Sequence, residues 1–236
     1  MRLDKLLANE GFGSRKDVKK IIKQGSVLVN GNVEKDVSKH VDPKQSEVVV
    51  NGEAIEYQEF VYVMLNKPKG VISATEDPKH KCVTDLLDSF YNKFNLFPVG
   101  RLDKDTEGLM LLTNDGDLAH RLTSPKHKVN KVYEATISGV VTDEDVQAFR
   151  EGVTLEDGYL TKPAILEVDD TTDEHSWVTV TIREGKFHQI KRMFKARHHE
   201  VRFLKRLKMG ALSLDYELAL GEYRELSEVE LEQLKG

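Results

Sequence analysis

The sequence predicts an α+β fold in two parts, a small N-terminal domain and a larger domain built on a mostly antiparallel mixed sheet. Short apolar repeats at helical spacing open the chain, and alternating apolar runs typical of strands dominate the rest. A length of 236 residues suffices for one large or two modest domains. A polar connection at Glu56–Phe60 separates two strand patterns, so we expect domains over residues 1–58 and 60–236.

The N-terminal part begins with two predicted helices. Leu3, Leu6 and Leu7 share one face of the first, and Ser14 with Asp17 forms a capping box before the second, Arg15–Gln24. Five cations gather on one side of the second helix: Arg15, Lys16, Lys19, Lys20 and Lys23. This face suits a phosphate backbone, the alternative being an ordinary solvated face. Two hairpins follow, with turns at Asn30-Gly31 and Asn51-Gly52.

The second part begins with a strand, VYVML (61–65), and a tight NKPKG turn. A short strand, VISA (71–74), and a short helix, Val83–Phe90, come next. In the turn, Lys67 and Lys69 are either RNA contacts or plain turn residues.

The stretch Phe97–Asp117 is the most informative part of the chain. Two apolar runs, NLFPV (95–99) and LMLLT (109–113), have the length and composition of buried strands. The connection between them is charged, except for Leu102, which we expect to turn inward and so to direct Arg101 and Asp103 to the opposite side. An acid beside a fixed cation at the mouth of a sheet is a candidate active-site carboxylate. The alternative is a charged loop with a structural ion pair.

The remaining pattern predicts further strands and helices. They are a helix at 117–122, strands at 129–138, 155–168 and 176–183, an acidic turn at 169–175, helices at 142–152 and from Phe187 onward, strands within 201–214, and an acidic helix at 226–234.

Charge is unevenly distributed. The net charge of −5 argues weakly against a nucleic-acid partner. Residues 183–208, however, hold ten Lys or Arg against two acids, and the segment from residue 215 onward holds seven acids against Arg224 and Lys235. Local sign matters more than the total, so the basic segment remains a candidate RNA surface.

Composition limits the class of protein. A hydrophobic share of 39% and a charged share of 32% are typical of soluble globular proteins. No apolar run approaches the roughly 18 residues of a membrane span, and MRLDKLLANEG lacks a signal-peptide core. With Cys82 as the single cysteine, we expect a cytoplasmic protein without disulfides or membrane attachment. We expect no metal site, because Cys82 is alone and His198-His199 lack a third ligand at a recognisable spacing.

Three segments resemble the RsuA-type ribosomal RNA pseudouridine synthases. The run GRLDKDTEGLMLLTNDG resembles the family signature, which implies that Asp103 is catalytic. HRLTSPKHKVNKVYEATISG is similar to the segment whose Tyr packs over the target base, here Tyr133. In residues 184–194 the resemblance makes Lys191 the partner of the catalytic Asp. Since relatives often carry Arg there, pairing through Arg192 stays open. The same segment has Phe187-His188 where relatives often have Asn-Arg.

The segment RLDKLLANEGFGSRKDVKKIIKQGSVLVNG resembles the S-four RNA-binding module, over about residues 1–58. Together the resemblances imply an S-four-type domain and a pseudouridine synthase domain, acting as a monomer without cofactor. The implied substrate is ribosomal RNA, with small-subunit (16S) RNA or an assembling particle favoured by HRLTSP…KVYEATISG and by the lack of a long basic tail. Arg101 is expected to fill the stack left by a flipped base. The expected RNA-binding residues are Arg2, Lys5, Arg15, Lys16, Lys19, Lys23, Arg101, Lys186 and Arg192.

Two other functions compete with this interpretation. A non-catalytic RNA-binding or ribosome-assembly factor would use the same basic helix, but it gives no reason for the Asp103 loop. A glycoside hydrolase could use Asp103 and Glu107, yet it would need an aromatic sugar platform, which Trp177 and a 7% aromatic content do not favour. Within the synthase interpretation, Asp103 could stabilise a cationic C1′, attack it, or remove the 2′ proton.

Overall fold

The computed structural model describes residues 1–55 and 57–236, which form two compact units. The first comprises Met1–Phe60 with Ser89–Asn95, and the second comprises Val61–Asp88 with Leu96–Gly236. Glu56, the first residue of the predicted connection, lies outside the described residues. The pattern placed 89–95 in the second domain by continuity, whereas its contacts place it in the first unit.

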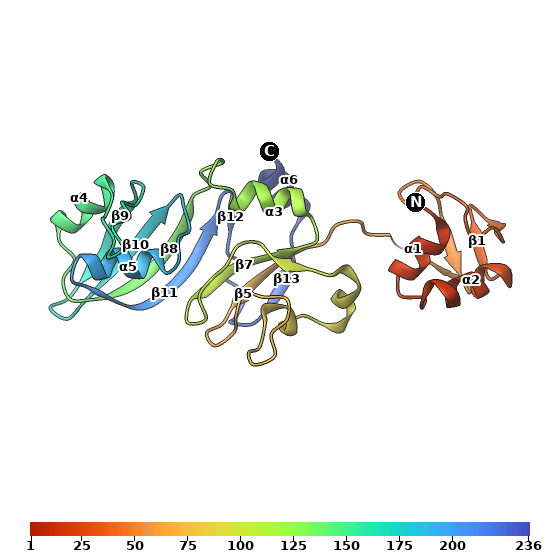
Figure 1. Ribbon diagram of the computed structural model, residues 1–236, viewed down its shortest axis with the longest axis horizontal. Coiled ribbons are helices and arrows are strands. Elements are labelled where there is room, and N and C mark those ends of the chain that lie inside the picture. Colours follow the sequence, from red (N-terminus) through yellow and green to blue (C-terminus); the bar gives the residue numbers. More distant parts are fainter. Residues whose placement is uncertain (56) are drawn as a thin grey trace. The chain divides into compact units, whose positions relative to one another are not determined.

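The first unit packs two helices on a small antiparallel sheet (Figure 1). Helices α1 (Leu3–Asn9) and α2 (Arg15–Lys23) bury five apolar side chains: Leu3, Leu6, Leu7, Val18 and Ile22. The strands are β1 (Val27–Val29), β2 (Asn32–Val33), β3 (Val48–Val50) and β4 (Glu53–Ala54), in the order β2-β1-β3-β4. The predicted capping box is confirmed, since the Asp17 backbone N–H donates to Ser14 Oγ and the Ser14 N–H donates to Asp17 Oδ2.

Both predicted hairpin turns are confirmed by their backbone angles. Asn30 and Gly31 have φ of 51° and 78°, and Asn51 and Gly52 have φ of 52° and 88°. Two successive positive φ values match the right-handed twist of the strands that they join.

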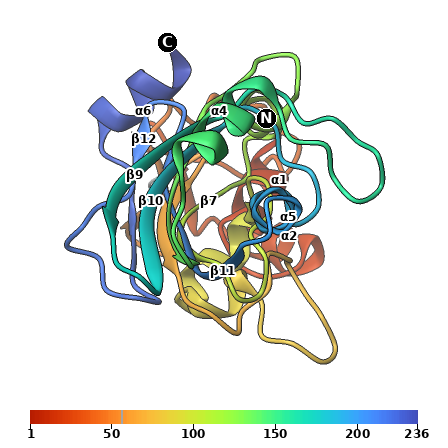
Figure 2. The ribbon, with the colours of Figure 1, turned by 90° about the vertical axis from the view of Figure 1, so that its left-hand side faces the viewer.

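The second unit is built on a nine-stranded sheet (Figures 1 and 2). Its main path runs β13-β5-β7-β11-β8-β10-β9, with β12 added to β11 and β6 added to β7. All pairings are antiparallel except β7 with β11, so the predicted mixed, mostly antiparallel sheet is confirmed. In chain order the strands are β5 (Tyr62–Lys67), β6 (Phe97–Pro98), β7 (Glu107–Thr113), β8 (Lys131–Ser138), β9 (Ile165–Thr171), β10 (His175–Ile182), β11 (Glu200–Met209), β12 (Leu212–Ser213) and β13 (Tyr223–Glu225).

The parallel joint between β7 and β11 depends on Gly108. A Cβ at this position would lie 2.3 Å from the backbone oxygen of Arg206, and its φ of 101° disfavours other residues. The joint brings the charged connection before β7 beside β11.

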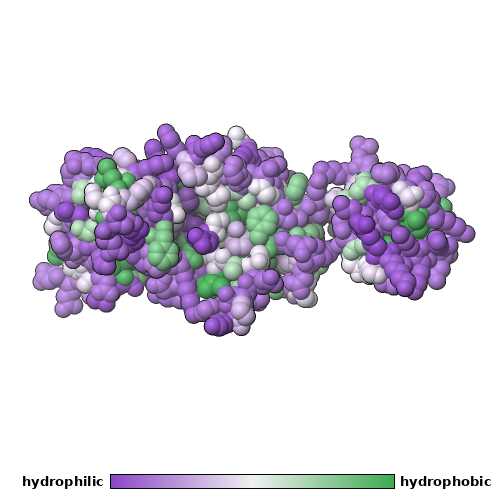
Figure 3. Space-filling view, in the orientation of Figure 1, coloured by the Kyte–Doolittle hydropathy of each residue, from purple (hydrophilic) through white to green (hydrophobic). Residues whose placement is uncertain are grey.

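Four helices cover the sheet: α3 (Gly116–Thr123), α4 (Asp143–Glu151), α5 (Gln189–Ala196) and α6 (Glu228–Lys235). Leu118 and Leu122 of α3 enter the core that includes Leu109 and Leu111 of β7. Phe149 of α4 and Phe194 of α5 join the helices at a ring distance of 4.8 Å. No helix within the described ranges is long and apolar enough to cross a membrane. Figure 3 shows a mostly hydrophilic face with scattered apolar residues.

Three predicted elements differ from the structure. VISA (71–74) makes one isolated bridge, Ile72 to Cys82, in place of a strand. The predicted helix at 83–90 is replaced by two 3₁₀ helices, η1 (Val83–Leu86) and η2 (Ser89–Phe94). The strand expected over 155–168 begins only at Ile165, because the Leu155 backbone N–H donates to the Tyr159 backbone oxygen and the chain first closes a loop. The strand then continues to Thr171, into the segment expected to be a turn.

Candidate active site

The charged connection between β6 and β7 is held by its one apolar residue. Leu102 is buried, as predicted, and both its backbone groups bond to the hydroxyl of Ser73 at 2.9 Å. The Thr106 N–H donates to the backbone oxygen of Asp103 at 3.1 Å. Arg101 is therefore exposed and Asp103 is partly exposed, on the side opposite Leu102.

Lys67 supports this connection from beneath. Its side chain is fully buried, and Nζ donates to the backbone oxygens of Asp103 at 3.1 Å, Thr106 at 2.8 Å and Pro68 at 3.0 Å. Burial lowers the pKa of Lys67 to about 8. From the sequence, Lys67 could be either an RNA contact or a turn residue. In the structure it is buried and supports the connection between β6 and β7. The sequence feature that could have indicated this internal role is the position of Lys67 at the end of an apolar strand.

The carboxylate of Asp103 faces Lys191. Lys191 Nζ lies 2.9 Å from Asp103 Oδ2 and 2.6 Å from Asp105 Oδ1. Partial desolvation of Lys191 works against its charge, but hydrogen bonds to Asp105 and Asp103 outweigh this and raise its pKa. Partial desolvation likewise opposes the charge of Asp105, yet the bond from Lys191 lowers the pKa of that carboxyl. A cation shared by two carboxylates is thus built into the site.

Arg192, the open alternative, points elsewhere. Its Nη2 lies 2.5 Å from Asp157 Oδ2, and its Nε lies 3.9 Å from Glu156 Oε1. In this structure, Lys191 and not Arg192 pairs with Asp103.

The start of α5 orients Lys191. Gln189 accepts the Lys186 backbone N–H at 2.9 Å and donates to Glu184 Oε1 at 2.8 Å. The predicted inward face of the helix, with Ile190, Met193 and Phe194, is buried as expected. Lys191 is therefore directed to the connection that carries Asp103.

His188 is a neighbour of Asp103 that the sequence did not single out. It has a left-handed backbone, with φ of 49°, and its Nε2 lies 3.6 Å from Asp103 Oδ1. The exposed ring of Phe187 stacks on it at a centroid distance of 3.8 Å. The sequence feature that could have indicated this neighbour is the aromatic pair Phe187-His188, at a position where relatives often carry Asn-Arg.

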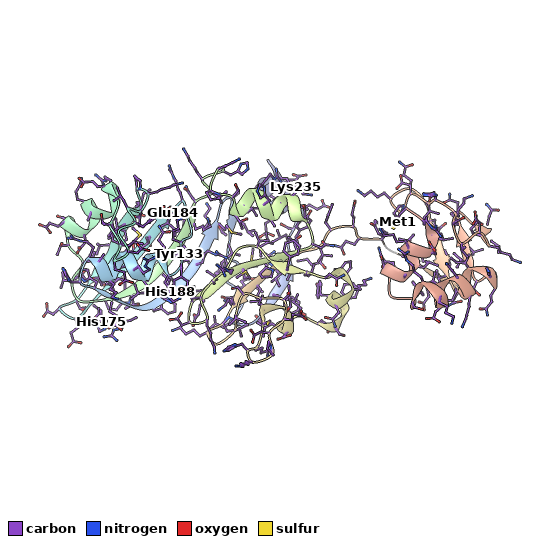
Figure 4. The ribbon with its side chains drawn as sticks, in the orientation of Figure 1. Met1, Tyr133, His175, Glu184, His188 and Lys235 are labelled. Carbon is purple, nitrogen blue, oxygen red and sulfur yellow. The ribbon has the colours of Figure 1, made fainter. Side chains whose placement is uncertain are left out.

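Tyr133 lies on β8 and is 7% exposed. It lines one cavity with Asp103 and Lys191, so side chains from the three motifs meet at one place. Arg101 and Lys186 line the same cavity. Figure 4 shows Tyr133, Glu184 and His188 in the same part of the second unit, with His175 at its far edge. An ionised carboxylate beside an aromatic ring can act on an electron-poor carbon held against that ring.

The other expected RNA-binding residues fall into two groups. Lys186 is exposed and places Nζ 4.7 Å from the centre of the Tyr159 ring. In the first unit, Arg2 bonds to the buried Asp4 at 2.9 Å. The remaining residues of that unit are exposed on α1 or α2: Lys5, Arg15, Lys16, Lys19 and Lys23.

Comparison with known proteins covers both units. Residues 61–196 match the family described as RNA pseudouridylate synthase, and residues 1–46 match the S4 domain, the S-four module. The chain is 54% identical over 234 residues to the uncharacterised RNA pseudouridine synthase YtzG of Bacillus subtilis, with 99% of this chain and 98% of the relative covered.

Two further relatives carry names for different ribosomal subunits. Identity is 40% over 239 residues to ribosomal large subunit pseudouridine synthase B of Bacillus subtilis, covering 100% of this chain and 96% of the relative. It is also 40% over 233 residues to ribosomal small subunit pseudouridine synthase A of Escherichia coli, covering 98% of each. A crystal structure of a pseudouridylate synthase superposes with a TM-score of 0.69 at 38% identity, covering 99% of each chain.

Proposed function

The chain belongs to the RNA pseudouridylate synthase family and is an RNA pseudouridine synthase, and we propose that it acts on uridine in ribosomal RNA with Asp103 as its catalytic carboxylate. The resemblance of the three motifs to the RsuA-type group is confirmed by the similarity over the whole chain. The observation that supports the role of Asp103 is its pairing with Lys191 at 2.9 Å in the cavity that Tyr133 lines.

The reaction exchanges one bond to the ribose for another. The bond from C1′ to N1 of uracil breaks, the base turns, and a bond from C1′ to C5 forms. The C5 proton leaves to solvent and N1 gains a proton, so atoms balance without an external co-reactant. Each possible action of Asp103 on the sugar requires the carboxylate to be ionised.

Lys191 supplies a cation in contact with that carboxylate when RNA closes the site. Enclosure by substrate removes water and disfavours charge, and a cation in contact offsets this cost. The ring of Tyr133 would hold the detached uracil by stacking, because a planar base gains from an aromatic face. Arg101, exposed at the rim, would replace the flipped base in its stack.

Small-subunit RNA is the finer proposal. It is supported by the resemblance of HRLTSP…KVYEATISG, while relatives named for either subunit share 40% identity with this chain. Pseudouridine mapping of ribosomal RNA from cells that lack the gene tests it: a site lost from small-subunit RNA supports it, and a site lost only from large-subunit RNA rejects it.

The role of Asp103 is tested by Asp103→Asn in single-turnover release of tritium from [5-³H]uridine-labelled ribosomal RNA. The amide is nearly isosteric, so fold and RNA affinity should survive. It can neither accept a proton as a carboxylate does nor support a cation or a covalent intermediate. Isomerisation should fall to background, a larger loss than the roughly 10²–10⁴-fold expected from losing acid–base help alone.

Asp105→Asn is the matched control. Asp105 binds the same Lys191 Nζ but its side chain is 70% exposed, and its loss leaves the Asp103–Lys191 pair in place. We expect a mild effect on the same assay. Appreciable turnover by Asp103→Asn, or an equal loss in Asp105→Asn, would overturn the assignment.

A further inference from the structure

A second cavity adjoins the candidate active site and is strongly cationic. Tyr133, Arg101 and Lys186 line both cavities. Six cations line the second one: Arg101, Lys131, Lys162, Arg183, Lys186 and Arg206. Glu184 is the one carboxylate in this lining within the described part of the chain.

Glu184 makes no ion pair with these cations within the described residues, and its oxygens accept from uncharged donors. They accept the Tyr159 hydroxyl, the Lys162 backbone N–H and Gln189 Nε2, each at 2.8 Å. These bonds fix the loop that carries Tyr159 and Lys162 to the start of α5. The six cations of the lining outnumber its one carboxylate, so a net positive charge remains.

The buried guanidinium of Arg206 is the clearest indication that this cavity binds an anion. It is 1% exposed, and its Nε donates to the backbone oxygen of Leu109 at 2.9 Å. Its Nη2 is buried and has no hydrogen-bond partner among the residues described. A buried charged donor without an acceptor is costly, so Nη2 is poised for an acceptor that the described residues do not supply.

Lys131 lies close to Arg206 along paired strands, since Lys131 opposes Met209 and Tyr133 opposes Arg206. Its Nζ makes one long bond, 3.4 Å to the backbone oxygen of Val129, and no carboxylate within ion-pair distance occurs for it in residues 1–55 and 57–236. Burial first, and the charge of Arg206 second, lower the pKa of Lys131. These two neighbouring cations thus repel one another.

We propose that this cavity, with Lys131 and Arg206 as its floor, is a phosphate subsite that holds a phosphodiester of the substrate RNA adjoining the nucleotide in the Asp103 cavity. The inference rests on the proposed function for the identity of that nucleotide. A phosphodiester carries the required negative charge and acceptor oxygens, and the shared Tyr133 wall places it next to the target base. It would anchor the sugar–phosphate backbone while uracil is detached from C1′.

The test measures equilibrium binding of a short oligouridylate as a function of salt. Lys131→Gln should weaken binding several-fold and lower the slope of log K against log salt by about 0.7, the value for one phosphate contact on a single strand. Lys131→Arg, which keeps the charge, should retain the slope. The matched control is Lys208→Gln, which removes an exposed cation opposite Val132 on the same pair of strands and should change the slope less.

A second measurement uses the unaltered protein, so that folding of a variant is not at issue. Lysine acylation read by mass spectrometry should show Lys131 protected by oligouridylate and unprotected by an uncharged methylphosphonate analogue. An unchanged slope in Lys131→Gln, an equal loss in Lys208→Gln, or equal protection by the uncharged analogue would overturn the phosphate subsite.

Neither measurement requires turnover, so the two proposals fail separately. If Lys131→Gln lowers the salt slope but the unaltered protein releases no tritium, the subsite is supported and the proposed reaction is rejected. Normal tritium release with an unchanged slope would reject the subsite alone.

Discussion

Tyr133 offers a ring and a hydroxyl whose contributions can be separated. Tyr133→Phe keeps the stacking surface and Tyr133→Leu removes it. If the ring retains the detached uracil, Phe should keep far more tritium release than Leu, since base–aromatic stacking is worth about 1–3 kcal/mol. Single-turnover rates and RNA affinity of the folded variants decide this. Equal inactivity of Phe and Leu would instead assign a chemical role to the hydroxyl.

Lys67 donates a hydrogen bond to the backbone oxygen of Asp103, which makes it a positioning residue. Lys67→Met keeps the stem but removes three hydrogen bonds, two of them to the connection, although loss of a buried ammonium offsets part of the cost. We expect kcat to fall by up to about 10²-fold through misplacement of Asp103, with RNA affinity unchanged. Lys81→Met, at an exposed position in a nearby loop, is the control. A rise in the RNA dissociation constant without loss of kcat would contradict this role.

At the level of elements, α2 presents a one-sided charge whose role is testable. Replacement of Arg15, Lys19 and Lys23 with Ala leaves the buried Val18 and Ile22 in place, so the helix should persist. Each phosphate contact that is lost should lower the log–log salt slope of ribosomal RNA binding by about 0.7–0.9. Turnover on saturating RNA should change much less. An unchanged slope would show that this face is merely solvated.

The elements that the sequence predicted correctly are those fixed locally. The Asn-Gly turns dictate positive φ, the Ser14–Asp17 box marks a helix start, and the apolar spacing of Ile190 and Phe194 defines the buried face of α5. Strand β13 was not anticipated, because its three residues are fixed by pairing with β5. The apolar segment VISA (71–74) does not form a strand, because it pairs with a neighbour at Ile72 alone and not along its length.

At the scale of the whole molecule, the residues missed by sequence reasoning are those defined by distant contacts. The resemblance of three segments to the RsuA-type family indicated Asp103, Tyr133 and Lys191, and the fold brings them to one cavity. The burial of Lys67 and Arg206 depends on pairing with strands remote in sequence, so the sequence analysis did not assign either residue an internal role. His188, which has a left-handed backbone just before α5, lies near Asp103 although the two are far apart in sequence.

Segment Ser89–Asn95 illustrates the same limit, since it lies in sequence between parts of the second unit but packs in the first. Its anchor is Lys93, whose Nζ lies 2.9 Å from Glu10 Oε2 and 4.9 and 4.8 Å from the ring centres of Phe90 and Phe94. The Glu10 side chain is only 7% exposed, and Lys93 is its ion-pair partner.

Lys93→Met should therefore destabilise the first unit selectively. Met keeps the apolar stem but leaves the Glu10 carboxylate unpaired, at a cost of about 1–3 kcal/mol. Amide hydrogen exchange should accelerate in α1 and β4 but not in β7 or β8, because the nine-stranded sheet contains neither partner. Lys93→Arg, which preserves both the ion pair and the ring contacts, should exchange like the unaltered protein. Equal acceleration in β7 and β8 would mean that the two units unfold as one, and no change in α1 would mean that the Lys93–Glu10 pair contributes nothing to the stability of the first unit.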